Sequence, residues 1–423
     1  MLLLQILLVS GCGKKPEKTG SVLSPDGAWN WCLDPRAVYV EGKFRRTYAG
    51  WMTHDGRLQV GFHDHGDGSF QSYTLKEKWD VDDHNSSTFL VLPDKRLMVF
   101  YARHNQQGLY CRKTAKPENI LEWEPEIPVS DTPRISYNHP VYLSEEEHFY
   151  AFWRGPTWKP TFSSSSDGEH WADPQVLICE KGQESNKIRP YVKVVSDEKS
   201  AIHFAFTENH PAHESNNSIY YLKYQKGIFY RADGTPVGDM AHLPLQHNVS
   251  DKVYDCQKGA ARAWIWDIAL DREGRPVIAY VRFPTETDHR YHYARWTGRE
   301  WFDVEMVKGG GWFPQDQIGK KQREMYYSGG LCLDHSNPSV VYLSRPVGGV
   351  FEIEKWKTED GGKTWSSRPI TRDSKSPNVR PFVPWGYKGE EDCVLWMHGD
   401  YIHYTQYRTS IRMKPEAPAK PLK

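Results

Sequence analysis

Short hydrophobic runs follow one another along the chain from about Trp29 to Tyr407, and each has the length and pattern of a β-strand. Examples are Leu58–Phe62, Arg96–Tyr101, His203–Phe206 and Val277–Val281, in which apolar and aromatic residues alternate or form compact blocks. Turns rich in Gly, Asp, Asn and Pro separate the runs, and long amphipathic stretches are nearly absent. The pattern therefore predicts an all-β protein.

Three motifs indicate how these strands are arranged. Thr358–Trp365 closely fits the Asp-box pattern S/T-x-D-x-G-x-T-W, Ser165–Trp171 is a shortened version, and Trp296–Trp301 is a degenerate one. In an Asp-box the Asp and Gly shape a turn between the outer strands of a propeller blade, and the Trp packs beneath a neighbouring strand. About 380 residues, at roughly 50 to 55 per blade, predict one seven-bladed β-propeller of four-stranded antiparallel blades. Six blades with long loops are the alternative.

The N-terminus has the features of an export signal. Residues 1–12 form an apolar segment that is too short to span a bilayer and ends in Val9-Ser10-Gly11-Cys12, which resembles a bacterial lipobox. We therefore expect lipidation (palmitate) of Cys12 and an exported protein anchored at the cell surface or outer membrane of a bacterium. No basic residue precedes the apolar run, and an ordinary signal peptide is the alternative. We expect a tether over 13–28, the propeller over 29–410 and a tail over 411–423.

The composition restricts the kinds of partner. Lys+Arg and Asp+Glu both number 54, so no basic field attracts nucleic acid, and we expect membrane contact through the lipid anchor only. The 17 Trp and 24 Tyr suit repeated β-sheets and sugar-stacking surfaces. Besides Cys12, six widely spaced cysteines form no CxxC pair, which favours buried apolar fillers over a disulfide framework. We expect a monomer.

Four polar residues at predicted strand ends supply a base, an acid and a fixed cation: His84, His104, Tyr137 and Arg154. The loops at one face of a propeller converge on its channel, so these side chains can share one site. Elimination next to a uronic acid needs such a set. A cation stabilises the charge that develops beside the carboxylate, a neutral His or deprotonated Tyr removes the C5 proton, and a Tyr hydroxyl protonates the departing O4. No metal or cofactor is required for this chemistry.

The sequence around these residues, together with the opening segment Trp31–Val38, resembles the seven-bladed propeller ulvan lyases over nearly the whole chain. The resemblance implies a polysaccharide lyase that cleaves ulvan, a sulfated polymer of rhamnose and uronic acids, by β-elimination and leaves an unsaturated uronic acid. It places His84 and His104 at the two His positions, Tyr137 at the acid or base position and Arg154 at the carboxylate-neutralising position. The same superfamily contains exo-α-L-rhamnosidases, some of which use the opposite face of the propeller. A rhamnosidase and a non-catalytic glycan-binding lipoprotein remain alternatives.

Other polar residues are candidates for binding substrate or metal. We expect substrate contacts from residues beside the four and from cations and a histidine further along the chain: Asn85, Asn138, His139, Arg189, Lys193 and His210. His and thiolate ligands suit tetrahedral zinc, which makes a structural zinc or calcium site conceivable at His213, Cys256, His289 and His292. The spacing of these four lacks a compact metal-site signature.

Overall fold

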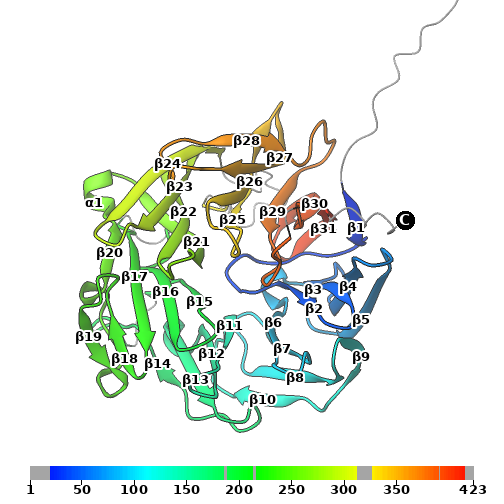
Figure 1. Ribbon diagram of the computed structural model, residues 1–423, viewed down its shortest axis with the longest axis horizontal. Coiled ribbons are helices and arrows are strands. Elements are labelled where there is room, and N and C mark those ends of the chain that lie inside the picture. Colours follow the sequence, from blue (N-terminus) through cyan, green and yellow to red (C-terminus); the bar gives the residue numbers. More distant parts are fainter. Residues whose placement is uncertain (1–19, 185–187, 213–215, 312–325, 390, 415–423) are drawn as a thin grey trace, which may run out of the picture.

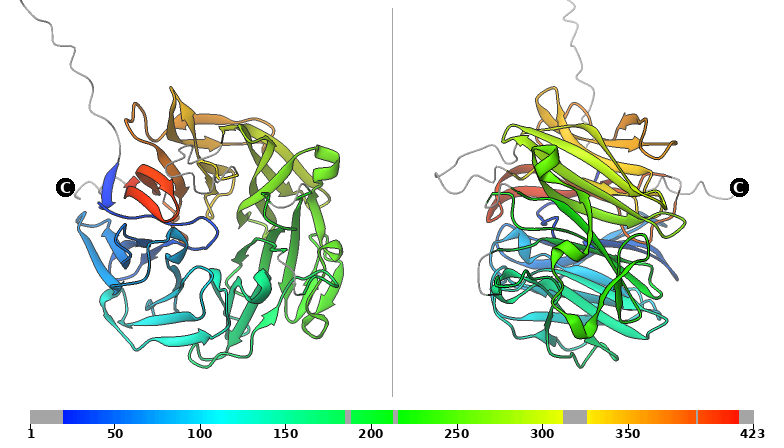
Figure 2. Two further views of the ribbon diagram at one scale, coloured as in Figure 1. Left: turned by 180° about the vertical axis from the view of Figure 1, so that it is seen from behind. Right: turned by 90° about the vertical axis from the view of Figure 1, so that its left-hand side faces the viewer.

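Seven antiparallel sheets surround a central axis in the computed structural model, which describes residues 20–184, 188–212, 216–311, 326–389 and 391–414 (Figure 1). The sheets succeed one another in chain order, and Figure 2 shows the same ring from behind and from the side. The predicted seven-bladed propeller is therefore confirmed. None of the helices in the described part of the chain combines the length and apolar character needed to cross a membrane.

Blades 1 to 6 contain strands in sequence order, from the innermost to the outermost, and two of these blades carry more than four strands. Blades 1 to 3 are β2 (Ala37–Glu41), β3 (Arg45–Met52), β4 (Leu58–Asp64), β5 (Phe70–Lys76); β6 (Thr88–Val91), β7 (Leu97–Ala102), β8 (Leu109–Lys116), β10 (Ile127–Ser130), with β9 (Asn119–Trp123) added on β8; and β11 (Ser136–Leu143), β12 (His148–Arg154), β13 (Pro160–Ser165), β14 (Gln175–Val176).

Blade 4 is the most elaborate, with β15 (Val192–Ser196), β16 (Ala201–Thr207), β17 (Ile219–Gln225), β18 (Ile228–Tyr230) and β19 (Pro236–Asp239), and β20 (Asp251–Tyr254) also pairs with β17. Blades 5 and 6 are β21 (Arg262–Leu270), β22 (Pro276–Thr285), β23 (Asp288–Trp296), β24 (Trp301–Gly310); and β25 (Leu331–Leu333), β26 (Val340–Val347), β27 (Val350–Lys357), β28 (Ser366–Pro369). The helices are short: η1 (Asp83–Asn85), η2 (Pro156–Trp158), η3 (Met240–His242), η4 (His247–Val249) and α1 (Cys256–Gly259).

The ring is closed by strands from both ends of the chain. Blade 7 consists of β29 (Asn378–Phe382), β30 (Val394–His403), β31 (Gln406–Lys414) and, as its outermost strand, β1 (Ser21–Ser24). This pairing corrects the expected boundaries, because part of the predicted tether belongs to the last blade and the propeller extends to Lys414. Hydrogen bonding to β31 explains the difference, since an unpaired outer edge would leave backbone groups unsatisfied. Cys12 lies outside the described residues, and its lipidation stays a prediction.

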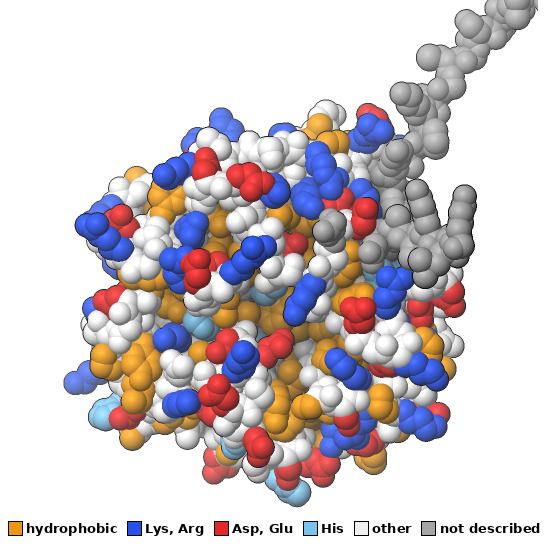
Figure 3. Space-filling model, in the orientation of Figure 1, with side chains coloured by type: hydrophobic (Ala, Val, Ile, Leu, Met, Phe, Trp, Pro, Cys, Tyr) orange, Lys and Arg blue, Asp and Glu red, His pale blue; other side chains and the backbone are white. Residues whose placement is uncertain are grey.

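The hydrophobic pattern places the core between neighbouring blades. Strand β7 is buried along its whole length because it is packed on both faces. Met98 and Phe100 from blade 2 pack with Ala151 and Trp153 from blade 3 in one of five such clusters. The six cysteines from Cys32 onward are buried and form no disulfide with one another, as expected for apolar fillers. In Figure 3, hydrophobic and histidine side chains occupy a central depression that charged side chains surround.

The three Asp-boxes lie at the turns where they were predicted. Thr358–Trp365 connects β27 to β28, Ser165–Trp171 lies between β13 and β14, and Trp296–Trp301 joins β23 to β24. In the first box the Asp360 carboxylate accepts hydrogen bonds from the backbone N–H and hydroxyl of Thr364, at 2.8 and 2.6 Å. These local bonds fix the turn and explain why the motif marks the third-to-fourth strand connection of a blade.

Candidate active site

The four predicted catalytic residues meet at one end of the inner strands of blades 2 and 3. His84 lies in η1, immediately before β6, and His104 follows β7. Tyr137 is the second residue of β11, and Arg154 is the last residue of the neighbouring strand β12. Because β6 and β7 are antiparallel, the start of one and the end of the other lie at the same edge, and the same holds for β11 and β12. The expectation that the four share one place in the fold is met by the geometry.

The two histidines form a stacked pair held by one carboxylate. Their ring centroids are 4.0 Å apart with an interplanar angle of 9°. Nδ1 of His84 lies 2.6 Å from Oδ1 of Asp82, and Nδ1 of His104 lies 2.9 Å from Oδ2 of the same side chain. Burial alone would raise the pKa of Asp82, but the two histidines lower it, so the carboxylate is ionised and both Nδ1 atoms donate to it.

The shared carboxylate leaves the two rings in different protonation states. Burial lowers the pKa of His84, but the charges of Asp82 and Asp83 outweigh it and raise this pKa to about 9. For His104, burial and the neighbouring charge of His84 lower the pKa to about 4 despite Asp82. His84 is therefore an imidazolium at neutral pH, while His104 is a neutral imidazole with a lone pair on Nε2.

A buried network fixes the position of His84. Its Nδ1 also lies 2.9 Å from Oδ1 of Asp83, whose carboxylate pairs with Arg380 of blade 7 and accepts a hydrogen bond from the Tyr401 hydroxyl at 2.5 Å. The side chain of Asp82 caps η1 by accepting the backbone N–H of His84 at 2.9 Å. Contacts from blade 7 thus hold the short helix that carries the histidine.

Arg154 is a buried cation that contacts His104 and Tyr137. Its guanidinium carbon lies 4.6 Å from the ring centroid of Tyr137. Nη2 donates to the Asn105 side-chain oxygen at 2.8 Å and to the Ser136 hydroxyl at 3.1 Å, and it lies 3.4 Å from Nε2 of His104. Nη1 donates to the hydroxyl of Tyr191 at 3.2 Å. Such multiple contacts fix the plane of the guanidinium.

Tyr137 is presented by a local irregularity of its strand. Its φ of 60° lies in the left-handed region, and the pairing of β11 with β12 shifts register between Ser136 and His139. A non-glycine residue in this region costs of order 1–3 kcal/mol, and such strain is concentrated at functional sites. Burial raises the pKa of Tyr137 well above its usual value, although Arg154 lowers it. The side chain is therefore a neutral phenol that can donate a proton.

Three further residues belong to the site and were not predicted from the sequence. Asp82 lies two residues before His84 in the sequence, but only the side-chain distances show that its carboxylate holds both histidines. Tyr191 contacts Arg154 and lies 5.5 Å from Tyr137 between ring centroids. Tyr404 packs edge-on against His84 at 4.9 Å from a position more than 300 residues away in the chain. No local sequence signal marks such a distant contact.

Four residues that were expected to contact substrate have side chains bonded inside the protein, and their role in substrate binding stays a prediction. Asn85 donates to the backbone oxygen of Trp79 and accepts the backbone N–H of His104 at 2.6 Å. Buried Asn138 accepts the Thr88 hydroxyl. The Nδ1 atom of buried His139 accepts the backbone N–H of Asp34 at 3.2 Å. Lys193 is buried in an ion pair with Asp34.

Arg189 and His210 remain possible substrate ligands. Arg189 is half-buried and lies two residues before Tyr191 in the chain. The His210 ring contacts the rings of Tyr191 and Trp264, at 5.5 and 4.4 Å between centroids. Both residues are therefore close to the aromatic side of the candidate site, and their role in binding stays a prediction.

The predicted metal group does not assemble among its described members. His289 and His292 are an odd number of residues apart on β23, so their side chains point to opposite faces of the sheet. His289 contacts the Ser328 hydroxyl at 2.7 Å, and Cys256 accepts a hydrogen bond from the Ser218 hydroxyl at 3.2 Å. His213 lies outside the described residues.

A different group, Asp82 with His84 and His104, is the one set in the described chain whose ligand atoms are close enough to share a metal ion, within 4.8 Å of one another. Two observations argue for ion pairing instead of metal binding. Both Nδ1 protons are directed at the carboxylate, and Nη2 of Arg154 lies 3.4 Å from Nε2 of His104, which carries that ring's remaining lone pair. A divalent cation at that lone pair would face the guanidinium charge.

Comparisons with known proteins agree with this fold. The sequence profile of the BNR repeat-containing family matches residues 46–308. The crystal structure of polysaccharide lyase Uly1 aligns with 94% of this chain and 98% of that chain, with a TM-score of 0.57 and 8% sequence identity. The lectin BP39L from Burkholderia pseudomallei aligns with 90% of this chain and 93% of that chain, with a TM-score of 0.50 and 9% identity. No curated protein matches the sequence. At such low identity the likenesses show the shared propeller fold.

Proposed function

The chain belongs to the BNR repeat-containing family, and from this premise we propose that it is a polysaccharide lyase that cleaves ulvan by β-elimination at a uronic acid. The observation that carries the proposal is the contact of a neutral imidazole, a neutral phenol and a fixed guanidinium in one site. His104 Nε2 lies 3.4 Å from Arg154 Nη2, and the guanidinium carbon of Arg154 lies 4.6 Å from the Tyr137 ring centroid.

The protonation states support a role for each member of the group. His104 is neutral above about pH 4 and has a lone pair on Nε2, so it can accept the C5 proton of the uronate. His84 is already protonated and cannot act as the base at neutral pH. The charges of His84 and Arg154 stabilise the enolate-like charge that develops on the uronate carboxyl group.

His104 and Tyr137 can account for both proton transfers of the proposed reaction. The C5–H bond breaks and its proton moves to His104 Nε2. The electron pair forms the C4=C5 double bond, the C4–O4 bond breaks, and the departing O4 takes the proton of the Tyr137 hydroxyl. The products are a shortened chain and an unsaturated uronic acid at the new non-reducing end. Proton exchange with solvent then restores His104 and Tyr137.

The proposed substrate rests on two kinds of support. The resemblance of the segments around His84, His104, Tyr137 and Arg154 to the propeller ulvan lyases favours a sulfated rhamnose–uronate polymer. The fold is also shared with a protein described as a polysaccharide lyase. We further propose that the chain is exported, is attached to the membrane through Cys12 and acts as a monomer without a required cofactor.

Incubation with ulvan tests the proposal directly. The elimination product absorbs at about 235 nm because its new double bond is conjugated with the carboxylate. We expect absorbance to rise with the wild-type protein and to stay flat with Tyr137→Phe. The matched control is Tyr73→Phe, the same change on the outer strand β5 of blade 1, which should leave the rate unaltered. Release of free rhamnose without absorbance would indicate a rhamnosidase instead, and neither product would indicate a glycan-binding protein.

A further inference from the structure

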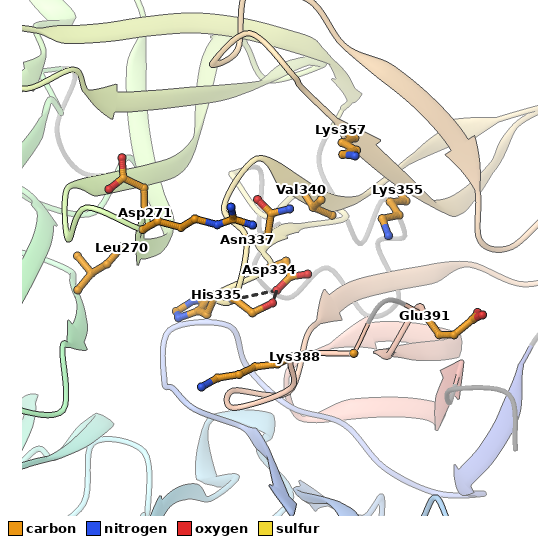
Figure 4. A pocket seen from close by; sticks show the side chains of 13 residues that line it. Leu270, Asp271, Asp334, His335, Asn337, Val340, Lys355, Lys357, Lys388 and Glu391 are labelled. Carbon is orange, nitrogen blue, oxygen red and sulfur yellow. Dashed lines mark hydrogen bonds between the residues drawn. The ribbon is translucent and has the colours of Figure 1, made fainter. Parts of the chain in front are cut away.

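A second hollow lies at the opposite end of the inner strands from the candidate active site. One pocket of about 660 Å³ is formed by the segments that follow β21, β25 and β29, and it is lined by Asp271, His335 and Lys388 among others (Figure 4). A neighbouring pocket of about 830 Å³ lies at the ends of β2, β6, β11 and β15. Both include Lys388 and Gly389, so the two adjoin. Volumes of this size accommodate several sugar residues.

The second hollow is separate from the histidine pair. Strand β11 begins at Ser136, beside Tyr137, whereas the pocket contacts the same strand at Pro140–Tyr142 and continues to Ser144. From Tyr137 the strand rises by roughly 10 Å to Pro140, the first residue of this strand that lines the pocket, and by roughly 16 Å to Tyr142, at about 3.3 Å per residue. A ligand bound at the far end of the strands therefore does not touch His104 or Arg154.

The hollow contains a preformed aromatic and imidazole surface. The rings of His335 and Trp385 stack with centroids 4.4 Å apart and an interplanar angle of 29°. Nε2 of His335 lies 3.1 Å from a carboxylate oxygen of buried Asp267, which fixes the imidazole. Within the described residues, the buried indole N–H of Trp385 has no hydrogen-bond partner. Aromatic faces with nearby polar groups are suited to sugar rings.

Two cations at this hollow have no ion-pair partner in the part of the chain that the structure describes. Lys355 pairs with Asp392 at 3.0 Å, and Asp271 pairs with Arg275 at 3.2 Å. Among the described residues, no ion pair involves Arg272 or Lys388. Figure 4 shows His335 between Asp271 on one side and Lys388 on the other.

Acidic side chains also border the hollow, and they limit the chemical class of ligand that it can bind. Asp334 accepts the backbone N–H and hydroxyl of Ser336, at 2.9 and 2.7 Å, and Glu391 lies at the rim. Carboxylates and amides next to cations can bond sugar hydroxyls, while Lys388 and Arg272 attract a carboxylate or sulfate. A polar ring-shaped ligand with a negative substituent satisfies both sets of groups.

We propose that this hollow is a second saccharide-binding site, which binds an acidic sugar residue between Lys388, Arg272 and the stacked His335–Trp385 pair. The site is distinct from the proposed catalytic centre and holds polymer without cleaving it. Binding at both ends of the channel would keep the enzyme on a polymer chain, because a second contact raises the effective concentration of the first.

Calorimetry with a defined probe tests the site. An ulvan tetrasaccharide is titrated into Tyr137→Phe, which prevents cleavage, and into the same protein carrying Lys388→Ala or Arg272→Ala. We expect two binding sites in the parent and, in each double variant, affinity about tenfold weaker at one site, the loss typical of one charged hydrogen bond. Lys258→Ala, an exposed lysine on α1, is the matched control and should leave both sites intact. Desulfated and carboxyl-reduced probes show which negative group Lys388 binds.

Each outcome decides the proposal. A single site that is insensitive to Lys388→Ala and Arg272→Ala overturns the second site and leaves the lyase proposal standing. Binding that is lost with Lys388→Ala, in a wild-type protein that produces no absorbance at about 235 nm, supports the second site and overturns the lyase. Two sites, of which one weakens with Lys388→Ala, support the inference, and an absence of all binding overturns it.

Discussion

Replacing Asp82 by Asn removes the carboxylate that both histidines share and leaves the size of the side chain almost unchanged. The rise in the pKa of His84 from 6.5 to about 9 corresponds to about 3 kcal/mol of preference for its charged form. Asp82 contributes most to that rise, since the other nearby carboxylate, Asp83, is paired with Arg380. In Asp82→Asn, burial becomes the main effect, and we expect the pKa of His84 to fall to 6.5 or lower.

The same change alters stability in a defined pH window. A raised folded-state pKa contributes stability that is complete below the unfolded-state value of 6.5 and is lost as pH rises through about 9. The lowered pKa of Asp82 contributes stability above its usual value of 3.8. The variant should therefore be less stable than wild type by about 2–3 kcal/mol near pH 6, and the difference should shrink towards pH 9 and above.

Two measurements check this prediction. Histidine-selective NMR titration, assigned with a His84→Gln spectrum, gives the pKa, and urea unfolding at about pH 6 and 9 gives the free energy of unfolding. The matched control is Asp239→Asn, because Asp239 pairs with His242 at 2.7 Å on the surface and its loss should leave the free energy of unfolding almost unchanged. A His84 pKa that stays near 9 in Asp82→Asn would refute the shared-carboxylate explanation.

Three further predictions concern the proposed catalysis. The rate of elimination should follow a bell-shaped pH profile. It should rise near pH 4 as His104 loses its proton and fall near pH 9 as His84 loses its proton. A flat profile from about pH 3 to 10 would contradict the assigned protonation states. Arg154→Lys keeps the charge but not the planar set of donors, so kcat should fall on the order of 100-fold while circular dichroism shows an unchanged fold. A normal kcat would rule out a fixed guanidinium as the stabilising cation. Dialysis against EDTA should leave the absorbance assay unaltered, and activity that is lost and then restored by one added metal would show that Asp82, His84 and His104 bind an ion.

The sequence predicts the propeller well because its signals are local. Alternating apolar runs specify strands, and the Asp-box at Thr358–Trp365 specifies the turn between two outer strands through bonds within a few residues. The N-terminal boundary was missed because Ser21–Ser24 has little hydrophobic character, and its strand exists through pairing with β31 at the other end of the chain. Pairing between residues that far apart leaves no local pattern.

The candidate site could likewise be predicted only where the sequence carries a local signal. His84, His104, Tyr137 and Arg154 were identifiable because polar residues next to strand ends, and a family resemblance, pointed to them. Lys193 was expected to contact substrate because alternating cations along a strand suit acidic groups, and no pattern in the sequence indicated that the fold would direct this side chain to buried Asp34. The protonation of the histidines could not be predicted either, since it depends on the distance of both rings from one carboxylate.

Cleavage of ulvan in water enriched in oxygen-18, followed by mass spectrometry of the new chain ends, tests elimination most directly. Elimination takes no oxygen from water, so we predict fragments without the heavy isotope and with one unsaturated uronic acid for each bond broken. Tyr137→Phe should yield no fragments under the same conditions. One heavy oxygen for each broken bond would show hydrolysis and contradict the proposed roles of His104 and Tyr137.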